Sequence, residues 1–182
     1  MVNYWHKRAY AELSTDPNDL GKRGLVYLMS EFFTISGSGS VSFVLETNGA
    51  TVQFESYDIS TDTYEIRASL LEAPTYTKFG ATIVPRNLNR NFLDASTVEL
   101  RSASAISGGV KIASELVGST SKSGAHGDNS RVHVLKPETG YVMTFVNQGN
   151  QATGAHMNLA WSEAEPASYD LVRYGINSGG VT

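Results

Sequence analysis

The chain has no cysteine, and this absence excludes several kinds of chemistry at once. Without thiols there can be no disulfide, no thiolate nucleophile and no zinc site with cysteine ligands. The redox compartment therefore cannot be inferred from the sequence. Stability must come from packing or from association with other chains.

Charged side chains are also scarce, since they make up 18% of the 182 residues. Ordinary soluble domains contain about 25%. The net charge of −4 argues against a phosphate-binding face, because nucleic-acid binding draws most of its energy from clustered Lys and Arg. We expect no nucleic-acid partner and a surface covered by Ser, Thr, Asn and Gly.

Long hydrophobic runs are missing as well. No segment approaches the roughly 18 apolar residues of a membrane span, and no apolar region of a signal peptide follows residues 1–8. We expect a soluble, unprocessed protein without a membrane partner. The length suits one domain with an arm at either end.

The sequence contains many short runs of β-branched and aromatic residues, separated by Gly, Pro and Asn. The clearest runs are 25–35, 41–47, 50–57, 63–71, 75–84, 131–135, 141–146 and 155–162. With turn signals every ~8 to 12 residues, about nine or ten strands are expected. The predicted fold class is all-β, an antiparallel β-sandwich of jelly-roll type.

Three further features of this pattern can be tested. Asn48-Gly49 lies between two strand-like runs and predicts a β-hairpin with a type I′ turn. Residues 96–106 and 109–117 are ambiguous, and the second has some helix-compatible spacing. Residues 118–130 are rich in Gly and Ser and predict a long mobile loop.

The expected domain boundaries follow from these segments. Residues 1–24 are predicted to form an N-terminal arm with a short helix from Tyr4 to about Leu13, which Pro17 follows. Residues 25–165 form the β-sandwich. Residues 166–182 form an edge strand and a flexible, Gly-rich tail.

No arrangement typical of an enzyme is evident. The four histidines lack metal-ligand spacing, and only His126, Asp128 and His133 could be assembled into a site. No Gly-x-Ser-x-Gly elbow of a serine hydrolase is present. The glutamates on the predicted strands, Glu46, Glu55, Glu65 and Glu72, alternate outward into solvent, so they give no evidence of the carboxylate pair of a glycosidase. We expect no catalytic residue, no metal and no cofactor.

Exposed aromatic side chains offer one candidate binding surface, because they could stack on sugar rings. The candidates are Trp5, Tyr10, Tyr57, Tyr64 and Tyr76. Core packing and subunit contacts account for the same residues, and we favour that interpretation.

The polar loop 86–91 offers another candidate surface. It carries two guanidinium groups, Arg86 and Arg90, and three amides, Asn87, Asn89 and Asn91. Guanidinium groups make bidentate contacts with carboxylates, so this loop could bind a neighbouring chain, although a solvated loop is the alternative. Trp5 and Tyr10 on the arm complete the set of candidate subunit or capsid contacts.

Residues from about 70 to 163 resemble a family of small virion proteins of tailed bacteriophages. The resemblance rests on "LLEAPTYTKFGATIVPRNLNRN", on "VHVLKPETGYVMTFVNQG" and on "HMNLAWSEAE". The first segment matches a family pattern of a strand followed by an Asn- and Arg-rich loop. The second matches Leu-Lys-Pro-x-Thr-x-Tyr with a strand that ends in Thr-Asn or Val-Asn. The third matches a last strand that ends in Leu-x-Trp-x-Glu. The N-terminal part up to Tyr57 matches only through its strand rhythm, and the tail after Glu165 is additional.

The resemblance implies a β-sandwich that forms a homotrimer and binds the major capsid protein on the outside of the shell, as a decoration or cement protein. It implies no catalysis, cofactor or metal. The protein is then made in the host cytoplasm and located on the virion surface. The alternative is a receptor- or carbohydrate-binding module of a tail fibre or spike.

Overall fold

The computed structural model describes residues 24–118, 126–129 and 133–164. Within these ranges the chain forms strands and no helix. The strands are β1 (Val26–Ile35), β2 (Ser40–Thr47), β3 (Thr51–Thr61), β4 (Ile66–Glu72), β5 (Thr75–Ile83), β6 (Arg86–Asn87), β7 (Val98–Ser107), β8 (Val110–Val117), β9 (His126–Asn129), β10 (His133–Leu135), β11 (Gly140–Asn147) and β12 (Thr153–Ala164).

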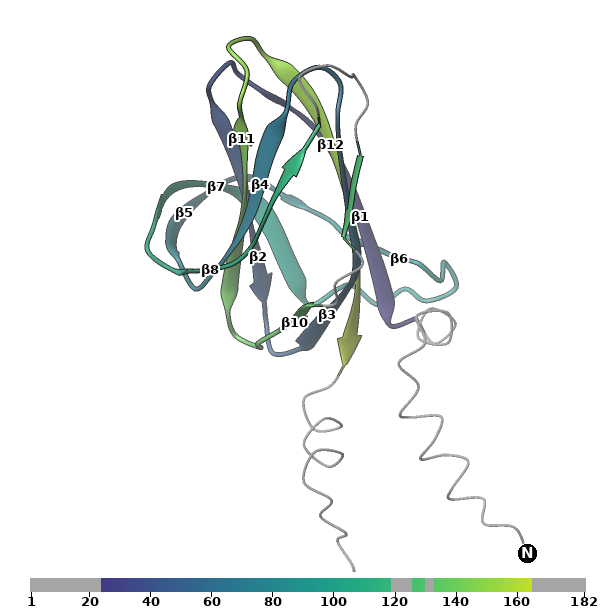
Figure 1. Ribbon diagram of the computed structural model, residues 1–182. Coiled ribbons are helices and arrows are strands. Elements are labelled where there is room, and N and C mark those ends of the chain that lie inside the picture. Colours follow the sequence, from purple (N-terminus) through teal and green to yellow (C-terminus); the bar gives the residue numbers. More distant parts are fainter. Residues whose placement is uncertain (1–23, 119–125, 130–132, 165–182) are drawn as a thin grey trace, which may run out of the picture.

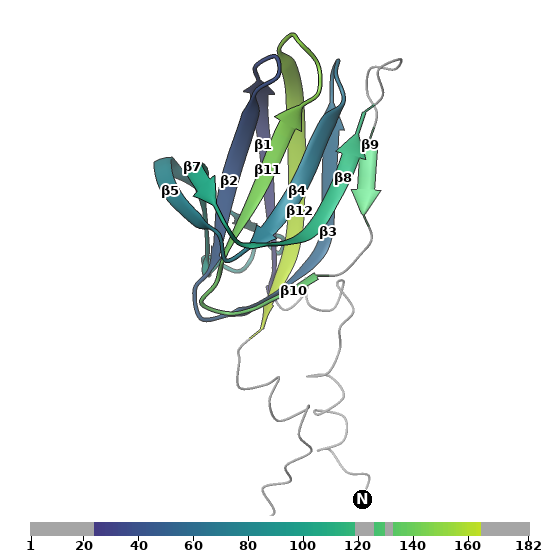
Figure 2. The same cartoon turned by 60° about the vertical axis from the view of Figure 1, so that its left-hand side comes forward.

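The strands form two antiparallel sheets that pack face to face (Figures 1 and 2). Sheet A has the order β10-β3-β12-β1-β6, and β9 also pairs with β3. Sheet B has the order β5-β7-β2-β11-β4-β8. A jelly roll has two four-stranded sheets packed face to face. Here one sheet contains β1, β12, β3 and the short strands β9 and β10, and the other contains β2, β11, β4 and β8. The predicted antiparallel β-sandwich is therefore confirmed.

Strands β5, β6 and β7 form an insertion, residues 75–107, between β4 and β8 of this jelly roll. The insertion widens both sheets, because β7 pairs with β2 in sheet B and β6 pairs with β1 in sheet A. In Figure 1, β5 and β7 curl away on one side while β6 lies on the other. The predicted strand at 75–84 is β5, and the predicted loop 86–91 begins with the short strand β6.

The predicted hairpin at Asn48-Gly49 is wrong. The strands on either side of it belong to different sheets: β2 pairs with β7 and β11, whereas β3 pairs with β12, β9 and β10. Gly49 does adopt a positive φ of 78°, as a turn signal suggests. The bend carries the chain from one sheet to the other, because both sheets bury their apolar faces in one core.

Tertiary pairing also decides the segments that the sequence left ambiguous. Residues 98–107 and 110–117 are both strands, β7 and β8, and β8 pairs with β4 rather than forming a helix. The predicted loop 118–130 is wrong at residues 126–129, which form β9 against β3. The predicted N-terminal helix and the predicted edge strand at 167–174 lie outside the described residues.

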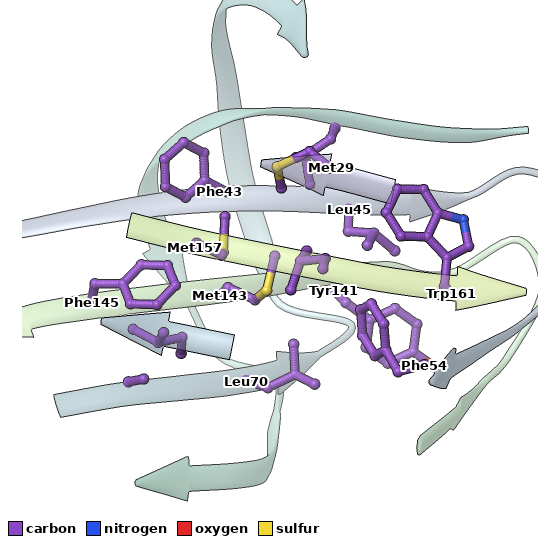
Figure 3. Packing of buried hydrophobic residues seen from close by; sticks show 14 of the residues in the cluster. Met29, Phe43, Leu45, Phe54, Leu70, Tyr141, Met143, Phe145, Met157 and Trp161 are labelled. Atoms are coloured by element: carbon purple, nitrogen blue, oxygen red, sulfur yellow. The ribbon is translucent and has the colours of Figure 1, made fainter. Parts of the chain in front are cut away.

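The core fills the space between the two sheets, as the close-up in Figure 3 shows. Met157, Leu159 and Trp161 on β12 are buried, as their alternation with His156, Asn158 and Ala160 predicts. From sheet B, the rings of Phe43 and Phe145 meet Phe33 of β1, each at a centroid distance of 5.1 Å. Burial of these apolar faces is the main stabilising term of the sandwich.

A hydrogen-bonded cluster fixes the turn between β10 and β11. The buried hydroxyl of Thr47 donates to the carbonyls of Lys136 and Thr139, at 2.5 and 3.1 Å. The Tyr141 hydroxyl accepts from the backbone N–H of Lys136 at 2.9 Å and donates to Glu72 at 3.3 Å. Three residues of the Leu-Lys-Pro-x-Thr-x-Tyr motif, Lys136, Thr139 and Tyr141, therefore stabilise this turn.

Asn147 has a similar role at the opposite end of β11. Its Nδ2 donates to the backbone carbonyls of Ile35, Ser36 and Gln151 at 3.3, 3.2 and 2.7 Å. Its Oδ1 accepts from the N–H of Gly149 at 2.8 Å. This single amide joins the β1–β2 connection to the β11–β12 connection.

Replacement of Asn147 by Ala should lower the free energy of unfolding by about 2–4 kcal/mol, because buried backbone groups lose their partners. Urea unfolding followed by tryptophan fluorescence measures the change. Asn150→Ala, an exposed asparagine in the same connection, is the matched control and should stay within about 0.5 kcal/mol of wild type. Equal losses in the two variants would contradict the assigned role of Asn147.

Candidate functional site

The segment 84–93, which includes β6, is built by two consecutive asparagine turns. The backbone N–H of Asn89 donates to Oδ1 of Asn87 at 2.9 Å, and the N–H of Asn91 donates to Oδ1 of Asn89 at 3.1 Å. Asparagine favours such turns because its side chain mimics a backbone carbonyl. The alternate asparagines thus shape the segment, while Leu88 and Arg90 between them point to solvent.

Asn87 also holds the segment against the start of β1. Only 7% of Asn87 is exposed, and its Nδ2 donates to the carbonyl of Gly24 at 2.7 Å. The N–H of Leu88 donates to the carbonyl of Val26 at 2.8 Å. Asn87 was a candidate contact residue, and its burial removes it from that set. Asn89 is half-buried, whereas Asn91 is exposed.

The segment exposes several large apolar side chains. Val84, Leu88, Phe92 and Leu93 are all exposed, and Leu93 reaches 96%. Leu28, on the adjoining strand β1, is exposed as well. Exposed large apolar side chains that lie together mark interaction surfaces, and Leu28, Val84 and Leu88 lie together because they line one hollow.

Arg86 and Arg90 lie in the same segment, and both are exposed. Among the described residues, neither guanidinium group forms an ion pair. Two basic side chains of sheet B differ in this respect. Lys78 forms an ion pair with Glu46 at 2.8 Å, and Arg101 forms one with Glu99 at 2.5 Å. The guanidinium groups of Arg86 and Arg90 are therefore exposed and free of ion pairs with the described part of the chain.

A hollow of about 820 Å³ separates this segment from the outer face of sheet A. Arg86, Leu88 and Arg90 form one side of it. Ser30, Ser56 and Asn158 are among the sheet residues that line it. The hollow combines apolar, amide, hydroxyl and guanidinium groups, a mixture that is typical of protein-binding surfaces.

The far end of the segment is anchored by Glu163, a buried carboxylate on β12. Its oxygens accept from the N–H and Oγ1 of Thr97 at 2.9 and 2.7 Å, and also from the hydroxyl of Ser96. The indole N–H of Trp161 donates to Glu163 at 2.9 Å. Since β6 is paired with β1 and residues 96–97 are bound to Glu163, the exposed segment is held at both ends.

Three of the aromatic residues predicted as a possible sugar platform, Tyr57, Tyr64 and Tyr76, have contacts within the fold. Tyr57 is half-buried and lines a small apolar cavity inside the sandwich. The ring of Tyr64 packs over Gly149, and its hydroxyl donates to Gln151 at 3.1 Å. The ring of Tyr76 packs over Gly140, and its hydroxyl donates to Glu46 at 2.6 Å. Burial, followed by the nearby Glu46 carboxylate, raises the pKa of Tyr76.

The remaining candidate residues are Trp5, Tyr10, His126 and His133. Trp5 and Tyr10 lie outside the described residues. His126 pairs with Ser60 and His133 with Phe54, so they lie six residues apart along β3. This is roughly 20 Å at about 3.3 Å per residue, too far for a shared metal ion. In the described ranges, no group of three or more His, Asp and Glu residues is suitably placed to hold a metal.

No helix in the part of the chain that the structure describes is long and hydrophobic enough to cross a membrane. Sequence reasoning missed Glu163 as an anchor and Phe92 and Leu93 as exposed residues. The Phe-Leu pair directly after a polar loop was a signal for the latter. The alternation along β12 was a signal for Glu163, because it places this residue on the same core face as Leu159 and Trp161.

No protein-family model matches the chain, and no curated protein sequence matches it. Among solved structures, it is similar to the crystal structure of the Yersinia pseudotuberculosis-derived mitogen. The two share 7% sequence identity with a TM-score of 0.37, and the match covers 72% of this chain and 83% of the mitogen chain. A similarity at this level carries no information about function.

Replacement of Glu163 by Ala should lower the free energy of unfolding by about 2–4 kcal/mol, because the indole N–H and the Thr97 N–H lose their acceptor inside the protein. The segment 84–97 should also become more susceptible to trypsin at Arg86 and Arg90. Urea unfolding and limited proteolysis measure the two effects.

Glu65→Ala, at a half-buried glutamate before β4, is the matched control and should change stability by no more than about 0.5 kcal/mol. If Glu163→Ala were as stable and as protease-resistant as this control, the anchoring role would be refuted.

Proposed function

We propose that this chain is a non-enzymatic structural protein of a tailed-bacteriophage virion. It decorates the outside of the capsid as a homotrimer and clamps neighbouring copies of the major capsid protein. The observation that carries the proposal is the exposed apolar segment 84–93, whose two arginines form no ion pair with any residue of the described ranges. Isolated soluble proteins rarely expose such patches, and Arg together with large apolar residues is typical of protein interfaces.

The rigidity of the segment supports a docking role. Its asparagine turns, its pairing with β1 and its anchor at Glu163 fix the contact residues before any partner binds. A preformed surface loses little conformational entropy on binding, so more of the contact energy appears as affinity. In a closed trimer, the segment of one copy contacts a different surface of the next copy.

The position of the segment also supports the proposal. Asn87 contacts Gly24, and the ring of Phe92 lies against the same glycine. Residues 1–23 join the sandwich at this point. The arm and the segment 84–93 therefore start from one region of the molecule, where they can act on the same partner.

Two sequence features add to this argument. The low content of charged residues suits a protein that buries much of its surface in an assembly. The resemblance to phage virion proteins covers the insertion that carries the segment. The jelly roll is also found in viral capsid proteins, which is an analogy of fold and not of site.

The alternative function, a receptor- or carbohydrate-binding module of a tail fibre or spike, depended on aromatic residues as a platform. Tyr57, Tyr64 and Tyr76 are engaged in packing and hydrogen bonds. A different aromatic residue, Phe32, is exposed on the outer face of sheet A.

The double variant Arg86→Ala with Arg90→Ala should dissociate the trimer or weaken it at least tenfold, since both arginines reach a partner and neither supports the fold. Light scattering coupled to size exclusion, over a range of concentrations, measures the change. Circular dichroism should be unchanged. Arg67→Ala, an exposed arginine on sheet B, is the matched control.

Leu93→Ser should have the same effect as the arginine variant, and Leu116→Ser, an exposed leucine on β8, should not. A wild-type chain that stays monomeric at every concentration would contradict the trimer. Unfolding of the double arginine variant would show instead that the segment has a structural role.

Imaging of the particles provides the direct test of the location. Particles of the phage that encodes this chain should carry protruding trimeric density on the outside of the shell, and deletion of the gene should remove it. The mutant particles should lose their DNA at a lower temperature than wild-type particles. Density confined to the tail would contradict the capsid location.

A further inference from the structure

Phe32 lies in the middle of β1, yet 76% of its side chain is exposed. The ring is nevertheless fixed, because it stacks on the imidazole of His156, its cross-strand neighbour, with centroids 3.9 Å apart and an interplanar angle of 8°. The imidazole is held in turn by Ser30, whose Oγ lies 2.8 Å from Nε2. His156 covers one face of the Phe32 ring, and the opposite face is open.

A hollow of about 460 Å³ adjoins this pair of rings. Thr34, Ser60, Asp62 and Gly154 contribute to its wall. The glycine is required there, since a Cβ at Gly154 would lie 2.6 Å from Oδ2 of Asp62. The missing side chain leaves room for the carboxylate of Asp62 to lie against the backbone of Gly154. The volume falls within the range of sites for small molecules.

Asp62 is a fixed and ionised hydrogen-bond acceptor in this hollow. Its Oδ1 accepts from Oγ1 of Thr153 and from the N–H of Gly154, each at 2.8 Å. The hydrogen bond from Thr153 is the largest cause that lowers the pKa of Asp62. A carboxylate has about four acceptor positions. Asp62 can therefore receive further donors from a ligand without losing its orientation.

These groups define the chemistry of a ligand. The open ring face favours apolar C–H groups, whereas the carboxylate and the hydroxyls of Thr34 and Ser60 favour hydroxyl groups. Among the described residues, no Lys or Arg lines the hollow, and the carboxylate of Asp62 disfavours an anion there. A pyranose ring has both required features, an apolar face of C–H groups and a rim of hydroxyls.

We propose that the hollow beside Phe32 on the outer face of sheet A is a binding site for a neutral saccharide. The sugar ring stacks on the open face of Phe32, and its hydroxyls donate to Asp62. The stacked His156 orients Phe32, and Gly154 provides the space in which the carboxylate of Asp62 lies. The site lies within one copy of the chain, so it does not depend on the proposed role in the capsid.

A heteronuclear NMR titration of the full chain tests the proposal. The probes are glucose, galactose, mannose and N-acetylglucosamine at millimolar concentrations. Tetramethylammonium is titrated separately, as a cation that could bind the aromatic ring in place of a sugar. At least one sugar should shift the amide signals of β1 and β12 around Phe32 and His156 in a saturable way. Tetramethylammonium should not, because a single open ring does not form an aromatic cage.

Phe32→Ala should weaken sugar binding at least tenfold, the loss expected when a central aromatic contact is removed. Phe79→Ala, an exposed phenylalanine on β5, is the matched control and should bind as wild type does. Asp62→Asn should also weaken binding, since the charged acceptor is lost while the shape is kept.

Three outcomes would overturn the proposal: no saturable shift with any of the sugars, binding that survives Phe32→Ala, or binding of tetramethylammonium in place of sugars. Light scattering on Phe32→Ala separates this proposal from the capsid role. The variant should assemble as wild type does whether or not sugar binding is lost.

Discussion

The buried carboxylate of Glu163 determines where the most exposed surface of this protein lies. It ends the core face of β12, where Trp161 donates to it, and it holds the chain at Thr97 before β7 begins. An uncompensated carboxylate inside a protein is costly, and hydrogen bonds from four donor groups offset that cost. The core fixes the position of β12. Glu163 on β12 in turn fixes Ser96 and Thr97 of the insertion.

Both proposed surfaces depend on the same pair of strands. The segment 84–93 is paired with the start of β1, and Phe32 and His156 are cross-strand neighbours farther along β1 and β12. Antiparallel register places their side chains on one face of sheet A at fixed spacing. The two surfaces adjoin, because Ser30, which holds His156, also lines the hollow beside the segment 84–93.

The short motifs behind the family resemblance have structural explanations. In Trp-x-Glu, the two residues share the inner face of β12 and are joined by a hydrogen bond. In Leu-Lys-Pro-x-Thr-x-Tyr, the hydroxyl of Tyr141 closes the turn. In Val-Asn, Asn147 joins two connections. Such motifs indicate a shared fold, whereas binding depends on the exposed residues between them.

The sequence by itself predicted most of the strands and, on β12, the direction of the side chains, because alternation is a local property that burial on one face imposes. It also predicted that Arg86 and Arg90 are available. Only the tertiary structure decided which strands pair, and so it overturned the hairpin at Asn48-Gly49. Pairing also decided that Asn87 is buried and that Phe32 is largely exposed, whereas Tyr57, Tyr64 and Tyr76 are half-buried. Burial depends on neighbours that are distant in the sequence, and no local pattern records them.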